Sequence, residues 1–379
     1  MTVLAELVDK STLDAVLRAR GTVASVYAGS APDVANEYQL GWSTRWGPMA
    51  DALREQGADE RTVTAVEREV AARSSSRAAR GTGHVAAFAK DGQVLATISA
   101  PGATWTDTAA CRALAHVTPL VAWAQQRPPY VVAVIDRAGA DIEVSPGAGG
   151  ASVVSTVEGP DDEIEWNDAS GLLSQGRAER RAEDSWRHNA GAVAEQVRAA
   201  LERVRARVLV VSGDVRAVRL LRERLPEWVH RSVTVEQIKG SRSPDGSQRG
   251  RADAVVRAIH NAAARDLDQL WGTFGEQRSP GGMAVEGEHA TLAALAEGRV
   301  GTLMVRPRDA DGRTAWFGAG PTDVQPIDQP APEWTDARLG PLVDVAVRSA
   351  LLTGAQVRVI PPEAEDGPAE GIAGLCRFR

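Results

Sequence analysis

Hydrophobic positions along the first third of the chain change period several times, and each change predicts a different element. The leucine and valine positions between 4 and 17 follow the period of a helix, and TVASVY at 22–27 alternates as a strand does. A long helical stretch at 59–79 leads into GHVAAFAKDGQVLATIS, in which Lys-Asp-Gly at 90–92 separates two strand-like runs. Asp-Gly between such runs favours a hairpin, so this part is predicted to be α/β with antiparallel pairing.

The middle of the chain alternates between strand and helix patterns. YVVAVIDRAGADIEV at 130–144 predicts two strands joined by a turn at 136–139. RVLVVSGD at 207–214 is a continuous apolar run, typical of a buried central strand, and residues 215–225 follow it with a helical pattern. Strands that alternate with helices in this way predict a partly parallel sheet with helices packed on it.

The last third predicts a further α/β unit. Residues 254–274 are helical in pattern, and HATLAALAEGR at 289–299 predicts a helix that ends at Gly298. VGTLMV follows as a strand, LVDVAVRSALLTGAQVRVI reads as helix and then strand, and a last strand is expected near 371–378.

Two breaks in the pattern suggest domain boundaries. The first is Arg-Pro-Pro at 127–129, and the second is the polar stretch KGSRSPDGSQRGRAD at 239–253. For a chain of 379 residues, two or three domains are expected from length alone. We therefore predict three domains, at 1–127, 128–240 and 249–379.

Composition limits the classes of protein to which the chain can belong. Charged residues make up 25% and apolar residues 43% of the sequence, as in globular proteins. We find no apolar run of about 18 residues and no secretory signal, so we expect a cytoplasmic protein without a membrane partner. The net charge of −7 argues against a protein that coats nucleic acid through bulk charge, so any RNA contact must be local. Cys111 and Cys376 are expected to be inert buried thiols.

The strongest local charge lies between residues 177 and 207, where eight arginines stand against five acidic residues. Arginine without lysine suits bidentate contact with phosphate. The alternative is a solvated helix face with ion pairs between neighbouring turns. Further along the same helix, an apolar stripe is expected to anchor it in a core; the stripe is Trp186, Val193, Val197 and Leu201.

Common catalytic motifs are absent from the sequence. There is no phosphate-binding GxxxxGK[ST], no HExxH, no CxxC and no GxSxG. Asp136 and Asp141 flank the turn of the middle hairpin and could together hold Mg²⁺, but aspartates at a turn are also ordinary turn chemistry. The acidic cluster at 161–163 favours a solvated loop over a cation site, and the glycine pair at 281–282 is weak evidence for a binding loop. We expect no metal and no cofactor.

The chain resembles the archaeo-eukaryotic class-1 release factor and Pelota superfamily. The resemblance rests on the order of VVAVIDRAGADI, the basic helix, RVLVVSGD, ALAEGRVGTLMV, LTGAQVRVI and GIAGLCRF, and it runs from about residue 20 to the end. It is closest to the bacterial members, which include the ribosome hibernation factor Balon and its actinobacterial relatives. It implies an RNase H-like middle domain and a third domain with the α/β fold of kink-turn-binding ribosomal proteins.

One departure from the superfamily concerns catalysis. Release factors carry Gly-Gly-Gln followed by Ser-x-x-Arg-x-x-Arg, and the glutamine loop places water against the ester of peptidyl-tRNA. This chain has Gly171, Leu172 and Leu173 at the aligned positions, while Ser174 and the arginines are kept. Leucine lacks both the backbone freedom of glycine and a polar group that could orient a nucleophile, so we expect no catalytic residue and no peptidyl-tRNA hydrolysis.

The resemblance implies a ribosome-binding hibernation or stress factor that occupies the A site of the 70S ribosome. The loop at 171–176 would reach toward the peptidyl-transferase centre, and the arginines would contact phosphates of 23S rRNA. The resemblance also implies an EF-Tu-type GTPase as a partner, and neither DNA nor a membrane is expected. The residues expected to contact rRNA or tRNA are Gly171, Leu172, Leu173, Ser174, Gln175, Gly176, Arg177, Arg180 and Arg181.

Three alternatives remain open at the level of sequence. The chain could be a ribosome-rescue peptidyl-tRNA hydrolase with an atypical loop, or a Mg²⁺-dependent nuclease that uses Asp136 and Asp141. It could also be a regulatory protein that keeps the fold without binding the ribosome, an option that the net charge of −7 mildly favours.

Overall fold

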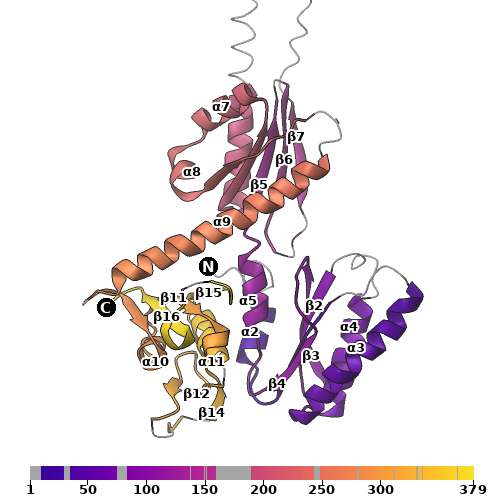
Figure 1. Cartoon of the computed structure of the whole chain (residues 1–379), viewed down its shortest axis with the longest axis vertical. Helices are drawn as coiled ribbons and strands as arrows, with labels where there is room; N and C mark the ends of the chain where they lie inside the picture. Colours follow the sequence, from indigo (N-terminus) through magenta and orange to yellow (C-terminus); the bar gives the residue numbers. More distant parts are fainter. Residues whose placement is uncertain are drawn as a thin grey trace, which may run out of the picture. The chain divides into compact units, whose positions relative to one another are not determined.

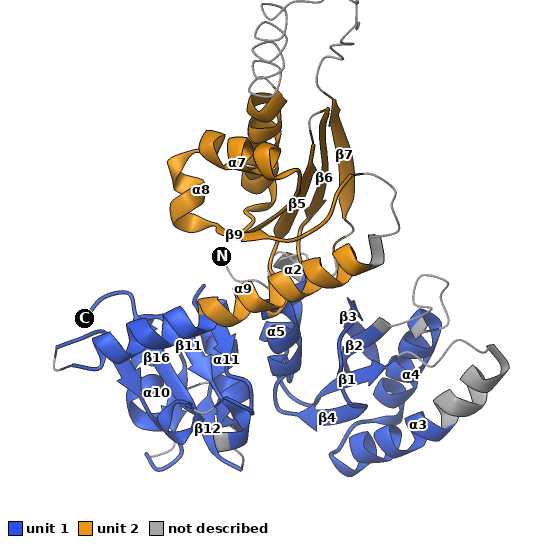
Figure 2. Cartoon of the chain, turned by 45° about the horizontal axis from the view of Figure 1, so that its top comes forward, with its two compact units in different colours: residues 1–125, 267–379 blue, residues 126–266 orange. Residues whose placement is uncertain are grey.

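The computed structural model forms two compact units (Figures 1 and 2). Unit 1 combines residues 1–125 with 267–379, and unit 2 consists of residues 126–266. The chain thus leaves unit 1 close to the predicted boundary at 127 and re-enters it within one helix; the division into three domains stays a prediction. The described residues are 10–29, 35–74, 83–136, 138–148, 150, 152–158, 189–242, 248–279, 281–310, 312–329, 332–334, 336–364 and 366–379.

The first part of unit 1 is built on an antiparallel sheet with the order β3-β2-β1-β4. The predicted hairpin is confirmed: Asp91 and Gly92 form its two-residue turn, with φ angles of 51° and 77°. Positive φ at both turn residues is what the favoured two-residue hairpin requires. The strands are β1 (Val23–Gly29), β2 (Gly83–Lys90), β3 (Gln93–Pro101) and β4 (Thr108–Arg112).

Helices pack on this sheet and complete its core. Side chains of α3 (Ala35–Glu55) and α4 (Glu60–Ser74) pack against one face, and the shared core includes Leu53, Val66 and Val26, each 0% exposed. The described residues of this part also form α2 (Lys10–Arg18) and α5 (Thr118–Gln125).

The second part of unit 1 contains two small sheets. One has the order β10-β16-β11-β15, in which β11 and β15 are parallel, and the other has the order β13-β12-β14. The predicted helices and strands near 289–305 and 342–378 are all present. The helices are α10 (Glu288–Ala296) and α11 (Leu342–Leu352), with 3₁₀ turns at Pro307–Ala310 and Ala369–Gly371. The strands are β10 (Ala284–Glu286), β11 (Val300–Val305), β12 (Thr314–Phe317), β13 (Val324–Pro326), β14 (Arg338–Pro341), β15 (Gln356–Val359) and β16 (Ile372–Cys376).

The two parts of unit 1 are joined by polar contacts of α11. The carboxylate of Asp344, which is 1% exposed, accepts from Arg112 Nη1 at 2.8 Å and lies 2.7 Å from His116 Nδ1. Arg348, 2% exposed, donates to the carbonyl oxygens of Leu17, Ala319 and Gly320. Burial is the largest influence on this guanidinium and lowers the pKa of Arg348 to about 10, so the side chain stays charged at neutral pH.

Unit 2 is a five-stranded sheet with the order β7-β6-β5-β8-β9. β5 pairs with β6, and β6 with β7, in antiparallel fashion, while β5, β8 and β9 are parallel. The predicted partly parallel sheet is therefore confirmed. The strands are β5 (Tyr130–Ile135), β6 (Gly139–Ser145), β7 (Val153–Glu158), β8 (Val208–Gly213) and β9 (Thr234–Gln237).

Helices cover both faces of this sheet, so β5 and β8 are almost wholly buried, as the apolar run predicted. One face packs on α7 (Val215–Arg224), α8 (Glu227–Ser232) and the helical residues 189–204. The other face packs on the first half of α9 (Gln248–Gln277), through Ala258, Ile259 and Ala262.

Two further predictions concern the described residues. Cys111 and Cys376 are both free and buried, as expected. A helix that could span a membrane is not found in the part of the chain described above.

Candidate nucleic-acid interface

The residues predicted to contact RNA lie outside the described residues. They are Gly171, Leu172, Leu173, Ser174, Gln175, Gly176, Arg177, Arg180 and Arg181, whereas the described chain stops at Glu158 and resumes at Asn189. The acidic cluster at 161–163 lies in the same gap.

The described part of the basic helix, residues 189–204, is held by the predicted apolar stripe. Val193, Val197 and Leu201 are 1%, 0% and 1% exposed and pack into the core of unit 2; Trp186 lies outside the described residues. On the outer side, Arg198 pairs with Glu195 and Glu202. The ion-pair interpretation therefore holds for this arginine, which is not available to phosphate without breaking those pairs.

The two aspartates of the middle hairpin are brought together, but by an arginine. Arg242 Nη1 lies 3.0 Å from Asp136 Oδ1, and Nη2 lies 3.1 Å from Asp141 Oδ1. Asp136 also accepts from the backbone N–H groups of Ala138 and Gly139 at 2.8 and 3.0 Å, the hydrogen bonds of an aspartate that begins a turn.

The charge of Arg242 is well compensated at this point. Its side chain is 17% exposed, and burial alone would lower the pKa of its guanidinium. The hydrogen bonds that the guanidinium donates to Asp141 and Asp136, with the negative charges of these aspartates, outweigh burial, so the pKa of Arg242 is raised overall. A guanidinium thus lies where the sequence suggested Mg²⁺, and no group of three or more metal-ligand side chains is found among the described residues.

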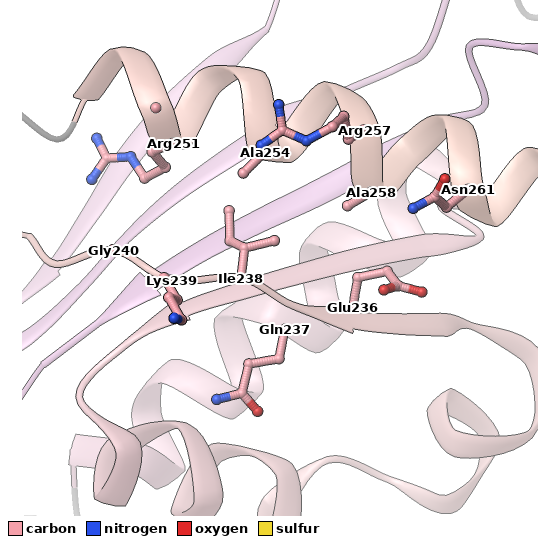
Figure 3. Close-up of a pocket in the computed structure, with 11 residues that line it drawn as sticks. Glu236, Gln237, Ile238, Lys239, Gly240, Arg251, Ala254, Arg257, Ala258 and Asn261 are labelled. Atoms are coloured by element: carbon pink, nitrogen blue, oxygen red, sulfur yellow. The ribbon is translucent and has the colours of Figure 1, made fainter.

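A groove of about 570 Å³ lies between the end of β9 and the first half of α9 (Figure 3). From the β9 side, Ile238, Lys239 and Gly240 line it, and from the helix side, Arg251 and Arg257 line it. The alanines of α9 and Ile238 form its apolar base, which continues into the core beneath the helix.

Two of the cations in this groove are exposed and make no ion pair among the described residues: Lys239 and Arg257. Arg251 donates from Nη1 to the carbonyl oxygen of Ser241 at 2.8 Å. The one acidic residue of the lining, Glu236, is paired with Arg265. The groove therefore carries an excess of positive charge, although the whole chain is acidic.

Sequence reasoning missed this groove. It treated residues 239–253 as a polar boundary between domains, and its search for basic residues stopped at the helix before β8. The arginines at 251 and 257 share a helix face with Ala254, Ala258 and Asn261, a spacing that an inspection of α9 for mixed basic and small residues would have found.

A family model matches the part of the chain that contains this groove. Residues 129–280 match the family model described as bacterial archaeo-eukaryotic release factor family 2. Two uncharacterized proteins of Mycobacterium tuberculosis, MT2704 of strain CDC 1551 and Rv2629 of strain H37Rv, are each 25% identical over 375 residues, which cover 96% of this chain and 95% of theirs.

Solved structures show weaker similarity. A model of ribosome-bound archaeal Pelota and ABCE1 shares 14% identity and covers 98% of this chain and 96% of that one, with a TM-score of 0.42. The structure of Saccharomyces cerevisiae Dom34, described as a translation termination-like factor that interacts with Hbs1, shares 8% identity and covers 78% and 79%, with a TM-score of 0.39. At these scores the likeness does not establish the fold. Residues 129–280 of the chain are therefore similar to bacterial archaeo-eukaryotic release factor family 2.

Proposed function

We propose that this protein is a ribosome-binding factor that occupies the A site without hydrolysing peptidyl-tRNA, as a hibernation or stress factor would. The observation that carries the proposal is the match of residues 129–280 to a release factor family. We add to it the alignment expected from the resemblance, which puts Leu172 and Leu173 at the positions of the second glycine and the glutamine of Gly-Gly-Gln. Similarity to release factors supports binding to the ribosome. Without a polar side chain at residue 173, the chain has no evident means of orienting water against an ester.

In this proposal the loop at 171–176 reaches toward the peptidyl-transferase centre. Arg177, Arg180 and Arg181 contact phosphates of 23S rRNA there, since a row of arginines suits bidentate phosphate contacts. The first part of unit 1 would lie nearer the decoding site, and an EF-Tu-type GTPase would engage the protein, as the resemblance to Pelota and Balon implies.

Co-sedimentation with 70S ribosomes tests the docking surface. Charge reversal at Arg177, Arg180 and Arg181, each to Glu, is expected to abolish co-sedimentation at moderate salt, because it replaces phosphate attraction by repulsion. The matched control reverses three exposed arginines elsewhere in unit 2, Arg203, Arg219 and Arg222, and should leave binding in place. Unchanged binding of the first variant, or equal loss in both, would contradict the proposed docking surface.

The nuclease alternative receives no support from the geometry. Arg242 forms ion pairs with Asp136 and Asp141, the two carboxylates on which a nuclease site would depend. Mg²⁺-dependent cleavage of RNA by the purified protein would overturn this conclusion.

A further inference from the structure

We propose that the groove between β9 and α9 is a second RNA-binding site, which holds the sugar-phosphate backbone of folded RNA. It is distinct from the loop and arginines at 171–181, and its phosphate-contacting side chains are Lys239, Arg251 and Arg257. The choice of RNA as the ligand rests on the proposed function; the choice of phosphate as the recognised group rests on the groove itself.

The cations of the groove are free to bind an anion. Lys239 and Arg257 are exposed and have no ion pair among the described residues. Arg251 uses Nη1 for the carbonyl oxygen of Ser241, and this contact leaves the second terminal nitrogen of its guanidinium for a ligand. The acidic residue of the lining, Glu236, is itself paired with Arg265.

Rigid elements hold these cations on two sides of the groove. Arg251 and Arg257 belong to the first half of α9. This half of the helix packs on the sheet through Ala258 and Ile259, which are 5% and 6% exposed. Lys239 follows β9, where the N–H of Ile238 still donates to the carbonyl oxygen of Val211 at 2.9 Å. Figure 3 shows Arg251 and Arg257 on α9, and Lys239 extending from the chain after β9 on the side away from α9.

The lining favours backbone recognition over base recognition. The described residues that line the groove include no aromatic side chain on which an unstacked base could stack. Proteins that bind single-stranded RNA rely on such stacking, whereas folded RNA is recognised largely through shape and phosphates. The side-chain amide of Asn261 on α9 can add hydrogen bonds to phosphate or ribose oxygens.

A buried polar group without a hydrogen-bond partner among the described residues lies next to the groove and supports the binding of a ligand there. The hydroxyl of Ser212 is fully buried and has no hydrogen-bond partner among the described residues. Residue 240, which lines the groove, is a glycine with φ of 150°, and a Cβ there would lie 2.8 Å from Ser212 Oγ. A side chain at residue 240 would thus crowd this hydroxyl, and the glycine leaves room for a water or a ligand oxygen that satisfies it.

Salt-dependent binding of an RNA hairpin to the full-length protein tests the site. A fluorescently labelled hairpin is titrated with wild type and with the Lys239→Gln/Arg257→Gln variant over a series of KCl concentrations. The slope of log K against log salt is expected to fall by about 0.7 to 0.9 for each phosphate that the variant no longer neutralises, and by the same amount for a second hairpin of unrelated sequence. The control, Arg203→Gln/Arg222→Gln, removes the same charge from α7 and the helix at 189–204, which cover the other face of the sheet, and should keep the wild-type slope.

The outcomes separate this site from the proposed function. An unchanged slope in the groove variant would overturn the site, as would tighter binding of a single-stranded oligonucleotide of equal length or full displacement of the hairpin by millimolar inorganic phosphate. Weaker hairpin binding by the groove variant would support the site, provided that its circular dichroism and melting temperature match those of wild type. Should wild type fail to sediment with ribosomes while hairpin binding stays sensitive to Lys239 and Arg257, the proposed function would be refuted and the site would stand.

Discussion

The thiol of Cys111 shows how burial controls reactivity in this protein. It is 6% exposed and lies in the core between the first sheet and helices α3 and α4. Burial, and after it the negative charge of Asp59, raises the pKa of this thiol to about 11. Only a small fraction of the side chain is thiolate at pH 8, roughly one part in a thousand, and thiolate is the reactive form.

Alkylation should therefore be slow and strongly dependent on pH. In a Cys376→Ser variant, which leaves Cys111 as the one thiol, the rate with iodoacetamide should rise about tenfold per pH unit between pH 8 and 10, because the thiolate fraction rises in that proportion below the raised pKa. Mass spectrometry of timed samples measures the rate, with the urea-denatured variant as control. Rapid alkylation of the folded variant at pH 8 would show that the thiol is neither buried nor shifted.

Among the helices and strands, the ones with long hydrophobic patterns could be predicted from the sequence. The hairpin of β2 and β3 followed from its Asp-Gly turn, and β8 followed from an unbroken apolar run. The strands β9 and β12 to β14, with three or four residues each, were missed because so few positions do not establish a period. The groove was missed for a related reason: the spacing within α9 gives only its helix side, and Lys239 joins the lining only when α9 packs on the sheet.

Unit 1 contains two aspartate–histidine pairs that differ in burial. Asp344 on α11 pairs with His116 at 2.7 Å and is 1% exposed, whereas Asp328 pairs with His289 at 2.8 Å with both side chains about 60% exposed. Asp344→Ala leaves Arg112 and His116 without their shared acceptor, so we expect a loss of about 3 kcal/mol in the free energy of unfolding. The matched control, Asp328→Ala, should cost less than about 1 kcal/mol.

Urea denaturation of both variants measures the difference. Because Asp344 joins the two parts of unit 1, its removal should lower the midpoint while the control stays near wild type. Equal midpoints for the two variants would mean that the buried network contributes no more than a surface pair.

For the whole molecule, the contrast between total and local charge matters most. The net charge of −7 opposes unspecific attraction to nucleic acid, so binding must come from sites where cations are concentrated. We propose two such sites, the arginines at 177, 180 and 181 and the groove of unit 2, and both fall within the region 129–280 that matches the release factor family. A protein of this kind should bind ribosomes with a steep dependence on salt.

Whether the loop at 171–176 reaches the peptidyl-transferase centre can be tested by restoring the release factor sequence. The Leu172→Gly/Leu173→Gln variant has the backbone freedom and the polar group that release factors use, so it should release peptide from peptidyl-tRNA-loaded ribosomes without regard to the codon, while wild type stays at background. The control, Leu172→Gly alone, restores flexibility without the glutamine and should stay at background. Release by wild type would make the protein a hydrolase after all. A double variant that sediments with ribosomes but releases no peptide would place the loop elsewhere on the ribosome, because both chemical deficits would then have been removed without effect.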